Sequence, residues 1–269
     1  MTRPIRVLVT GVGGATIGEQ VCKALRMGHH RYDIIVTNIS RSPLAVFKAE
    51  DCAVMPPATA SGYLDAVVAL VEKYKVQFII PGSEPELIKI SQCREAFAHT
   101  SARLLINADA VIAACVDKRR TFEYLAAHGF RVPATFEISD VTELDRLATG
   151  FPYIVKPAQG GGGSAVTFLA QDRAELHVFV DYLLRYGYRP LVQEYVGSAE
   201  NEYTVGVLHN PDGTLVGSVV LRRRILSGLS NRLRVPNRTG RSELGDVLAI
   251  SSGISQGSIV DFPPVRIQA

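Results

Sequence analysis

Short apolar runs alternate with amphipathic stretches through the first 107 residues. Runs rich in valine, isoleucine and leucine predict five strands, Ile5–Thr10, Asp33–Asn38, Cys52–Met55, Gln77–Pro81 and Ala102–Asn107. Between them, apolar positions three and four residues apart predict a helix that ends near Met27 and another over Ser61–Tyr74. Strands that alternate with helices are typical of a parallel sheet covered by helices. We therefore expect a Rossmann-like α/β domain over residues 1–113.

A different pattern begins after residue 113. Residues 117–125 predict a helix that closes at His128-Gly129, and Tyr153–Val155 is a short β-branched run that stops at a Lys-Pro pair. Apolar spacing predicts a further helix over Arg173–Tyr186, and Pro190–Val196 returns to an extended pattern. We expect these elements to form a small α+β domain over residues 114–196.

Beyond residue 197 the alternation of apolar and polar residues indicates a hairpin. The segments 203–208 and 215–225 flank Asn210-Pro211-Asp212-Gly213, a sequence typical of a turn. Alternation along the second strand predicts that Arg222 and Arg224 share one face of it and Arg223 the other. We expect residues 197–269 to form a third domain.

Composition narrows the class of protein. Hydrophobic side chains make up 47% of the 269 residues and charged ones 20%, which is typical of a globular chain. No apolar run approaches the roughly 18 residues that span a bilayer, and the N-terminus does not resemble a signal peptide. The 4 cysteines lie far apart without a C-x-x-C pair, which predicts buried free thiols. We expect a cytoplasmic protein with no membrane partner.

The net charge of +3 says little by itself, but the positive residues are unevenly distributed. Seven arginines and no acidic residue lie between Arg222 and Arg241. A nucleic-acid surface is one interpretation of such a stretch. No aromatic residue lies among these arginines to stack on bases, so we expect no nucleic-acid partner.

The candidate chemistry centres on Lys156 and the glycine-rich stretch behind it. The run Gly160-Gly161-Gly162-Gly163-Ser164 cannot pack a core, but its backbone N–H groups can close over an anion. A strand-end lysine adds a point charge suited to phosphate. Each feature alone is more often a surface turn or a solvated side chain. Together they predict a nucleoside triphosphate held between Lys156 and the glycine loop, although the P-loop pattern G-x-x-x-x-G-K-[ST] is absent.

Several segments together resemble the ATP-grasp superfamily, and most closely its carbamoyl-phosphate-synthase-like carboxylate–amine ligases. They are Lys118, Val155-Lys156-Pro157, residues 160–164, Gln193-Glu194-Tyr195-Val196 and Glu202-Tyr203-Thr204-Val205. The resemblance covers essentially the whole chain. It implies a Rossmann-like pre-ATP-grasp domain followed by an ATP-grasp fold, in which two α+β lobes clamp ATP between them.

The resemblance also implies which residues hold ATP. Lys118 and Lys156 would contact the phosphates, and Glu202 would accept hydrogen bonds from the ribose hydroxyls. The loop over the phosphates would comprise Gly160, Gly161, Gly162, Gly163 and Ser164. The contacts to adenine would come from Glu194, Tyr195 and Val196.

Arg222 and Arg224 are the candidate catalytic residues. Two guanidinium groups on the pocket side would neutralise an acyl phosphate as it forms. A plainer interpretation is that these arginines make an exposed basic edge that prevents strand pairing. Likewise, Glu194 could be a solvent-facing strand end, and Glu202 the cross-strand partner of an arginine.

The glycine turn after the first strand supports a competing hypothesis. Gly11-Val12-Gly13-Gly14 leads into a helix, as in dinucleotide-binding proteins. Such a site requires Asp or Glu at the end of the second strand, where this chain has Asn38, and the turn serves equally well for close packing. After the fourth strand, Glu84 and Glu86 either meet an amine substrate, as the resemblance implies, or simply begin a helix.

The end of the sequence departs from the family pattern. ATP-grasp ligases hold magnesium through an acid on a late strand and a Glu-x-Asn motif soon after it. This sequence stops at Ala269 without that motif, so we assign no metal ligand and expect the magnesium ligands beyond Ala269. We expect the sequence to be a fragment with an incomplete ATP-grasp fold that is catalytically poor alone.

The function implied by the resemblance is ATP-dependent ligation. ATP would phosphorylate a small-molecule carboxylate, and an amine would then displace the phosphate to form a C–N bond. A homodimer is a further expectation. Two alternatives stay open: a non-catalytic ATP-binding module or split-enzyme subunit that needs a partner chain, and an NAD(P)-dependent Rossmann protein.

Overall fold

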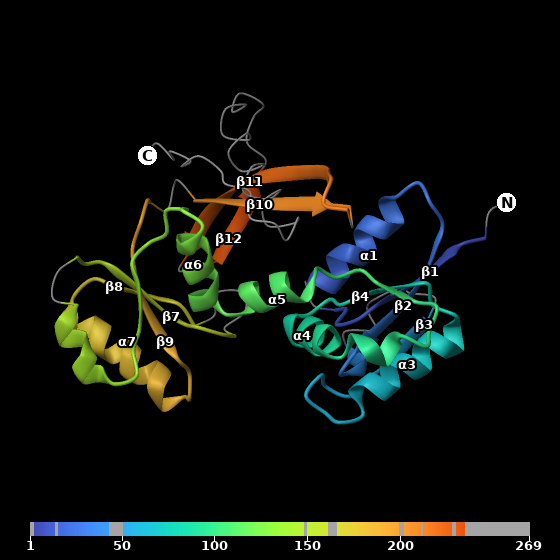
Figure 1. Ribbon diagram of the computed structural model, residues 1–269, viewed down its shortest axis with the longest axis horizontal. Helices are drawn as coiled ribbons and strands as arrows, with labels where there is room; N and C mark the ends of the chain where they lie inside the picture. The colour runs from blue at the N-terminus through green and yellow to red at the C-terminus, as the bar shows by residue number, and fades with distance from the viewer. Residues whose placement is uncertain are drawn as a thin grey trace. The chain divides into compact units, whose positions relative to one another are not determined.

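The computed structural model describes residues 3–13, 16–42, 51–147, 150–160, 166–198, 202–210, 212–227 and 230–234 (Figure 1). The chain divides into two compact units, Met1–Ile112 and Ala113–Ala269, and each unit is considered by itself. No helix in the described ranges is both long and apolar enough to cross a membrane.

A five-stranded parallel sheet forms the centre of the first unit, so the predicted α/β class is confirmed. Its strands lie in the order β3-β2-β1-β4-β5. They span Ile5–Val9 (β1), Tyr32–Asn38 (β2), Asp51–Val54 (β3), Phe78–Ile80 (β4) and Arg103–Leu104 (β5). β1 and β4 are parallel neighbours although two strands separate them in sequence. The order in which successive strands are added to the sheet therefore reverses at this pair. Open α/β sheets bind ligands at such a point.

Helices cover both faces of this sheet because its strands are apolar on both sides. Val7 and Val9 pack with Cys22 of α1 (Ile17–Met27) on one face. Leu8 packs with Tyr63 and Val67 of α3 (Tyr63–Tyr74) on the other face, together with α4 (Glu84–Gln92). Figure 1 shows α3 and α4 together on one side of the sheet. A short 3-10 helix η1 (Arg94–Phe97) and α5 (Asp109–Val116) complete the described elements of this region.

The second unit contains a four-stranded antiparallel sheet in the order β6-β9-β7-β8. Its strands are Thr135–Glu137 (β6), Tyr153–Pro157 (β7), Phe168–Ala170 (β8) and Pro190–Glu194 (β9). Helix α7 (Arg173–Arg185) covers one face, where Val155 and Val192 pack against Leu176, Val180 and Leu183. Helix α6 (Lys118–Ala127) contacts β6. The 3-10 helix η2 (Val141–Arg146), which the pattern did not predict, begins with a capping box between Asp140 and Glu143.

The predicted hairpin is present as a three-stranded antiparallel sheet in the order β10-β11-β12. Its strands are Glu202–His209 (β10), Leu215–Ser227 (β11) and Ser230–Arg234 (β12). β12 was not predicted, because its alternation of arginine with polar and apolar residues gives no apolar run.

The prediction of buried thiols is wrong for most of the cysteines. All four are free, but only Cys22 is buried, whereas Cys52 and Cys115 are exposed. Cys52 lies on β3, the edge strand of the parallel sheet, which has a neighbour on one side only. An apolar run at a sheet edge therefore does not guarantee burial.

Candidate functional site

Lys156 lies on the face of the four-stranded sheet that α7 does not cover. Tyr153 and Val155 are buried against α7, and alternation along β7 directs Lys156 to the opposite face. There its Nζ donates a hydrogen bond to Gln193 Oε1 at 2.7 Å and lies 5.1 Å from the centre of the Phe122 ring of α6. Gln193 Nε2 in turn donates to Thr135 Oγ1 at 2.7 Å. This chain of bonds holds the Lys156 ammonium in place.

Lys118 reaches the same region from the first residue of α6. Its backbone N–H donates to Ala158 O at 2.9 Å, and its Nζ donates to Gly160 O at 3.1 Å. The structure therefore brings Lys118 close to Gly160 and to Lys156, which leaves their predicted contact with phosphates a prediction. The register of β7 alone would not have indicated this, because Lys118 is 42 residues from Gly160 in the chain.

The two lysines form a pair of positive charges whose hydrogen bonds, within the described residues, go to uncharged groups. Burial, and then the positive charge of Lys118, lower the pKa of Lys156 to about 8. In the parts of the chain that the structure describes, both ammonium groups bond to uncharged oxygens, and neither has a carboxylate partner. An anion bound between them would relieve their mutual repulsion.

Gly160 opens onto unfilled space. Its φ is +71°, a region that favours glycine, and a Cβ added there would meet nothing within 4 Å. The loop residues Gly161, Gly162, Gly163 and Ser164 lie outside the described residues. Gly160 is thus placed beside both lysines without contributing to packing.

Glu194 ends strand β9 and is anchored to the chain before β6. Its N–H donates to Ala134 O at 2.8 Å, and its Oε2 accepts from the Ala134 N–H at 3.1 Å. Tyr195 is half-buried and Val196 is 65% exposed, so this strand end presents an apolar surface to solvent. The predicted contacts of these three residues with adenine stay a prediction.

The remaining predicted site residues belong to the three-stranded sheet. Glu202 is the register partner of Arg223, as in the plainer of the two sequence interpretations. Arg222 is exposed and pairs with Tyr203 on one side and Arg234 on the other, and Arg224 pairs with Arg232. The side chains of Glu202 and Arg224 lie outside the described part of the structure.

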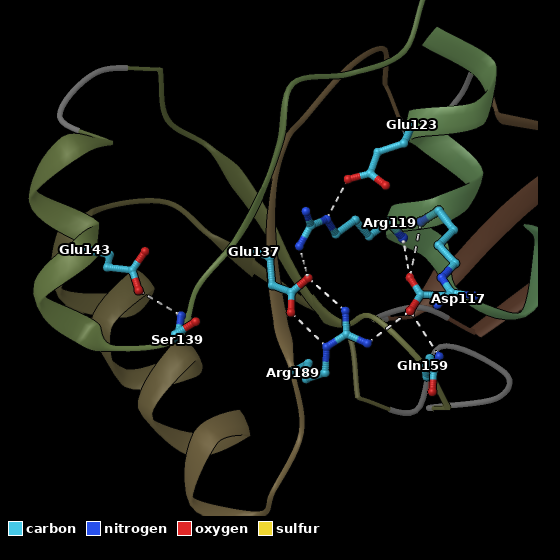
Figure 2. Close-up of polar contacts among 9 residues, drawn as sticks. Asp117, Arg119, Glu123, Glu137, Ser139, Glu143, Gln159 and Arg189 are labelled. Atoms are coloured by element: carbon cyan, nitrogen blue, oxygen red, sulfur yellow. Dashed lines mark hydrogen bonds and ion pairs between the residues drawn. The ribbon is translucent and has the colours of Figure 1, made fainter. Parts of the chain in front are cut away.

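A charged network next to Lys118 was not predicted from the sequence (Figure 2). Asp117, almost fully buried, caps α6 by accepting from the N–H groups of Arg119 and Arg120. Its second oxygen, Oδ2, accepts from Gln159 Nε2 and from Arg189 Nη1, each at 3.0 Å. Arg189 also grips both oxygens of Glu137, at 2.7 Å and 2.8 Å.

Arg119 completes this network, which we call the Asp117 network: Asp117, Arg119, Glu123, Glu137, Gln159 and Arg189. Arg119 donates to Glu137 at 2.8 Å and to Glu123 at 2.6 Å. The Arg189 fork, against partial burial and with help from Arg119, lowers the pKa of Glu137 to about 2. Burial would raise the pKa of Asp117, but hydrogen bonds from Arg120, Arg189 and Gln159 outweigh it and leave that pKa below its ordinary value.

A cavity of about 640 Å³ lies between α6, β6 and η2 rather than around the two lysines. Its charged lining includes Arg119 and Glu137, which are ion-paired with each other. Because these charges are already balanced, the cavity offers an anion less than the lysine pair does. We therefore assign the candidate anion site to the lysines.

Glycines on either side of the first unit's glycine turn are closely packed. A Cβ on Gly18 would lie 2.7 Å from Thr10 O, and one on Gly82 would lie 2.0 Å from the same oxygen. Asn38 Nδ2 donates to Val12 O at 2.9 Å, so the residue at the end of β2 supports the turn. These contacts agree with the packing interpretation of the turn.

Both acidic residues after β4 lie in the first turn of α4. Glu86 is buried and accepts from Ser83 Oγ at 2.6 Å, whereas Glu84 is exposed. A Cβ on Gly11 would lie 2.5 Å from Glu86 Oε2, so the glycine makes room for this carboxylate. The helix-start interpretation of the two acids is consistent with this placement.

The fold and the lysine pair define a class of protein with a parallel α/β unit followed by a unit whose antiparallel sheet presents Lys156, with Lys118 bonded to Gly160. The chain belongs to the ATP-grasp superfamily: residues 115–227 match the ATP-grasp domain, and residues 7–105 match the PylC-like N-terminal domain.

Curated proteins are similar to part of the chain. The chain is 33% identical over 121 residues to beta-citrylglutamate synthase B of Danio rerio, covering 43% of this chain and 29% of the relative. It is 32% identical over 122 residues to D-alanine–D-alanine ligase of Rhodococcus opacus, covering 43% of this chain and 32% of the relative. The match thus spans about a third or less of these relatives' lengths.

Solved structures show the shared fold. N5-carboxyaminoimidazole synthetase of Staphylococcus aureus, complexed with ADP, superposes with a TM-score of 0.71 at 14% identity. The superposition covers 95% of this chain and 64% of that one. The arrangement of elements is therefore common to proteins with little sequence identity.

Proposed function

We propose that this chain binds the triphosphate of ATP between Lys118 and Lys156, as the nucleotide-binding part of an ATP-dependent carboxylate–amine ligase. The observation that carries the proposal is the pair of lysines that bond only to uncharged oxygens within the described residues, beside the open Gly160. The relatives named as synthases and ligases support the reaction class.

The chemistry of such a ligase has two steps. A carboxylate oxygen attacks the γ-phosphorus of ATP, the bond from that phosphorus to the β,γ-bridging oxygen breaks, and ADP leaves. The amine nitrogen then attacks the acyl carbon, phosphate departs with the electrons of the broken C–O bond, and the nitrogen loses a proton. The protein contributes positioning and electrostatic stabilisation, which fixed ammonium groups can supply.

The other predicted residues take the roles that the family resemblance implies. Glu194, Tyr195 and Val196 would contact adenine, and Glu202 would contact ribose. Arg222 and Arg224 would neutralise the acyl phosphate or the substrate carboxylate. Within the described residues no three histidine, cysteine, aspartate or glutamate side chains gather to hold a metal ion, so we assign none of these residues to magnesium.

Calorimetric titration of the chain with ATP, ADP and NADH tests the nucleotide. We expect ATP and ADP to bind more tightly than NADH, and tighter binding of NADH would contradict the proposal. Phosphate release from ATP, measured with panels of carboxylates and amines, separates a ligase from a non-catalytic module. Release that requires both a carboxylate and an amine supports the ligase, whereas ATP binding without release under any combination favours the module.

A further inference from the structure

The Asp117 network is the described cluster of charges that the proposed nucleotide contacts do not use. Its buried carboxylate, Asp117, accepts four hydrogen bonds: two from backbone N–H groups at the start of α6, and two from Gln159 and Arg189. Figure 2 shows Arg189 between Asp117 and Glu137, with its guanidinium directed at both. All three of its nitrogens therefore have carboxylate partners.

Both positive charges in the network are paired with carboxylates. Two guanidinium groups, on Arg119 and Arg189, face three carboxylates, on Asp117, Glu123 and Glu137. Guanidinium groups that are already forked onto carboxylates have few donors left for a phosphate. The network is therefore not a second anion site, and its function must be sought in what it holds.

The network holds both parts of the candidate phosphate site. Asp117 directly precedes Lys118, and Gln159 directly precedes Gly160. The backbone continues the connection, because the Lys118 N–H donates to Ala158 O at 2.9 Å and the Ala158 N–H donates to Arg189 O at 2.8 Å. Arg189 thus contacts Asp117 through its side chain and Ala158 through its carbonyl oxygen.

We propose that Asp117 and Arg189 are positioning residues that fix Lys118 and the Gln159–Gly160 turn for the phosphates without touching the nucleotide. This inference rests on the proposed function. Its physical basis is conformational entropy. Because the network already fixes the backbone at Lys118, only the freedom of the lysine side chain is lost when Lys118 binds an anion. Removing the fork should therefore weaken phosphate contacts and leave contacts to the nucleoside unchanged.

The test compares the affinities of ATP and adenosine in Arg189→Gln, Arg189→Lys and the control Arg185→Gln. Arg185 is exposed, and among the residues that the structure describes its ion-pair partner is Asp181, one turn earlier on α7. We expect Arg189→Gln to bind ATP about tenfold more weakly, the equivalent of one charge-assisted hydrogen bond, with adenosine affinity within about twofold of wild type. Arg189→Lys keeps the charge but not the fork, so its ATP affinity should lie between those of wild type and Arg189→Gln. Arg185→Gln should bind ATP as wild type does.

Gln159→Ala provides a second test if Arg189→Gln does not fold, because Gln159 is exposed and its one described side-chain bond is to Asp117. We expect it to weaken ATP about threefold, and adenosine not at all. Equal losses for ATP and adenosine, or no loss in a folded variant, would overturn the positioning role. If wild-type protein binds ATP no better than adenosine, the proposed function fails as well, so the two failures are distinguishable.

Discussion

Two clusters of charge lie side by side along the start of α6, and they are built in opposite ways. In the Asp117 network, every guanidinium has carboxylate partners, and the pKa of Glu137 falls to about 2. In the lysine pair, the ammonium groups of Lys118 and Lys156 bond to Gly160 O and Gln193 Oε1, and the pKa of Lys156 falls to about 8. One cluster lowers the pKa of an acid by supplying cations, and the other lowers the pKa of Lys156 by burying its ammonium group near the positive charge of Lys118.

The difference indicates which cluster serves structure and which serves binding. A satisfied network adds stability and has little to gain from a ligand, whereas burying the Lys156 ammonium group near a second positive charge costs stability that a bound anion can restore. Functional sites commonly show this type of local cost. The following predictions test the contrast, beginning with the largest expected effect.

Replacing Asp117 at the centre of the Asp117 network should be severely destabilising. Asp117→Ala removes the cap of α6 and the carboxylate that accepts from Arg189 and Gln159, and we expect it to lower the free energy of unfolding by about 3 kcal/mol. Urea denaturation measures the loss for the whole protein, and hydrogen exchange of the β7 and β9 amides measures it locally. Asp181→Ala, which removes an i,i+4 partner of Arg185, is the control and should cost no more than about 0.5 kcal/mol. Similar losses in both variants would show that the network is no more than a set of surface pairs.

The lysine pair should make the protein more stable as the pH rises in the alkaline range. The folded-state pKa of Lys156 is about 8 and its ordinary value is 10.5, so the unfolded chain binds more protons between these limits. Stability without nucleotide should therefore rise from pH 8 to pH 10.5, by about 2 kcal/mol after allowing for partial solvent exposure. Lys156→Met should abolish this rise, measured by urea midpoints across the range. A wild-type profile that is flat or falling there would mean that the ammonium is not destabilised in the folded state.

The Asp117 network should make the stability of the folded protein depend on pH in the acid range. The folded-state pKa of Glu137 is about 2 and its ordinary value is 4.5, so its contribution is complete above about pH 4.5 and is lost as the pH falls toward 2. Because its arginine partners are half exposed, we expect this contribution to be about 1–2 kcal/mol. Glu137→Gln should be less stable at neutral pH and lose less stability on acidification. Glu72→Gln, at an exposed pair in the first unit, should keep the wild-type acid profile.

The sequence predicted the elements well where apolar runs are strong. The strands of the parallel sheet and helix α7 lie within a few residues of their predicted ranges. It failed where tertiary contacts decide: η2 depends on a capping box, and β12 forms by pairing with β11 rather than by its own apolar pattern. The candidate site divides in the same way.

Lys156 and the glycine loop were visible because they are close in sequence. Lys118 came from family resemblance, since nothing in its local pattern distinguishes it from other lysines. The Asp117 network could not be predicted, because Arg189 is 72 residues from Asp117 and 52 from Glu137, and each appears in sequence as an ordinary charged residue. The antiparallel pairing of β6, β9 and β7 brings Glu137 and Arg189 together, and the bond from the Lys118 N–H to Ala158 O brings Asp117 to them.

The most direct test of the unbalanced lysine pair is a calorimetric titration of the Lys118→Met/Lys156→Met double variant with ATP and with adenosine. We predict that ATP affinity falls at least about 100-fold, as expected for the loss of two charge-assisted contacts, and that adenosine affinity changes less than about twofold. Lys73→Met, an exposed lysine of the first unit, should bind both ligands as wild type does. Wild-type affinity for ATP in a folded double variant would contradict the account.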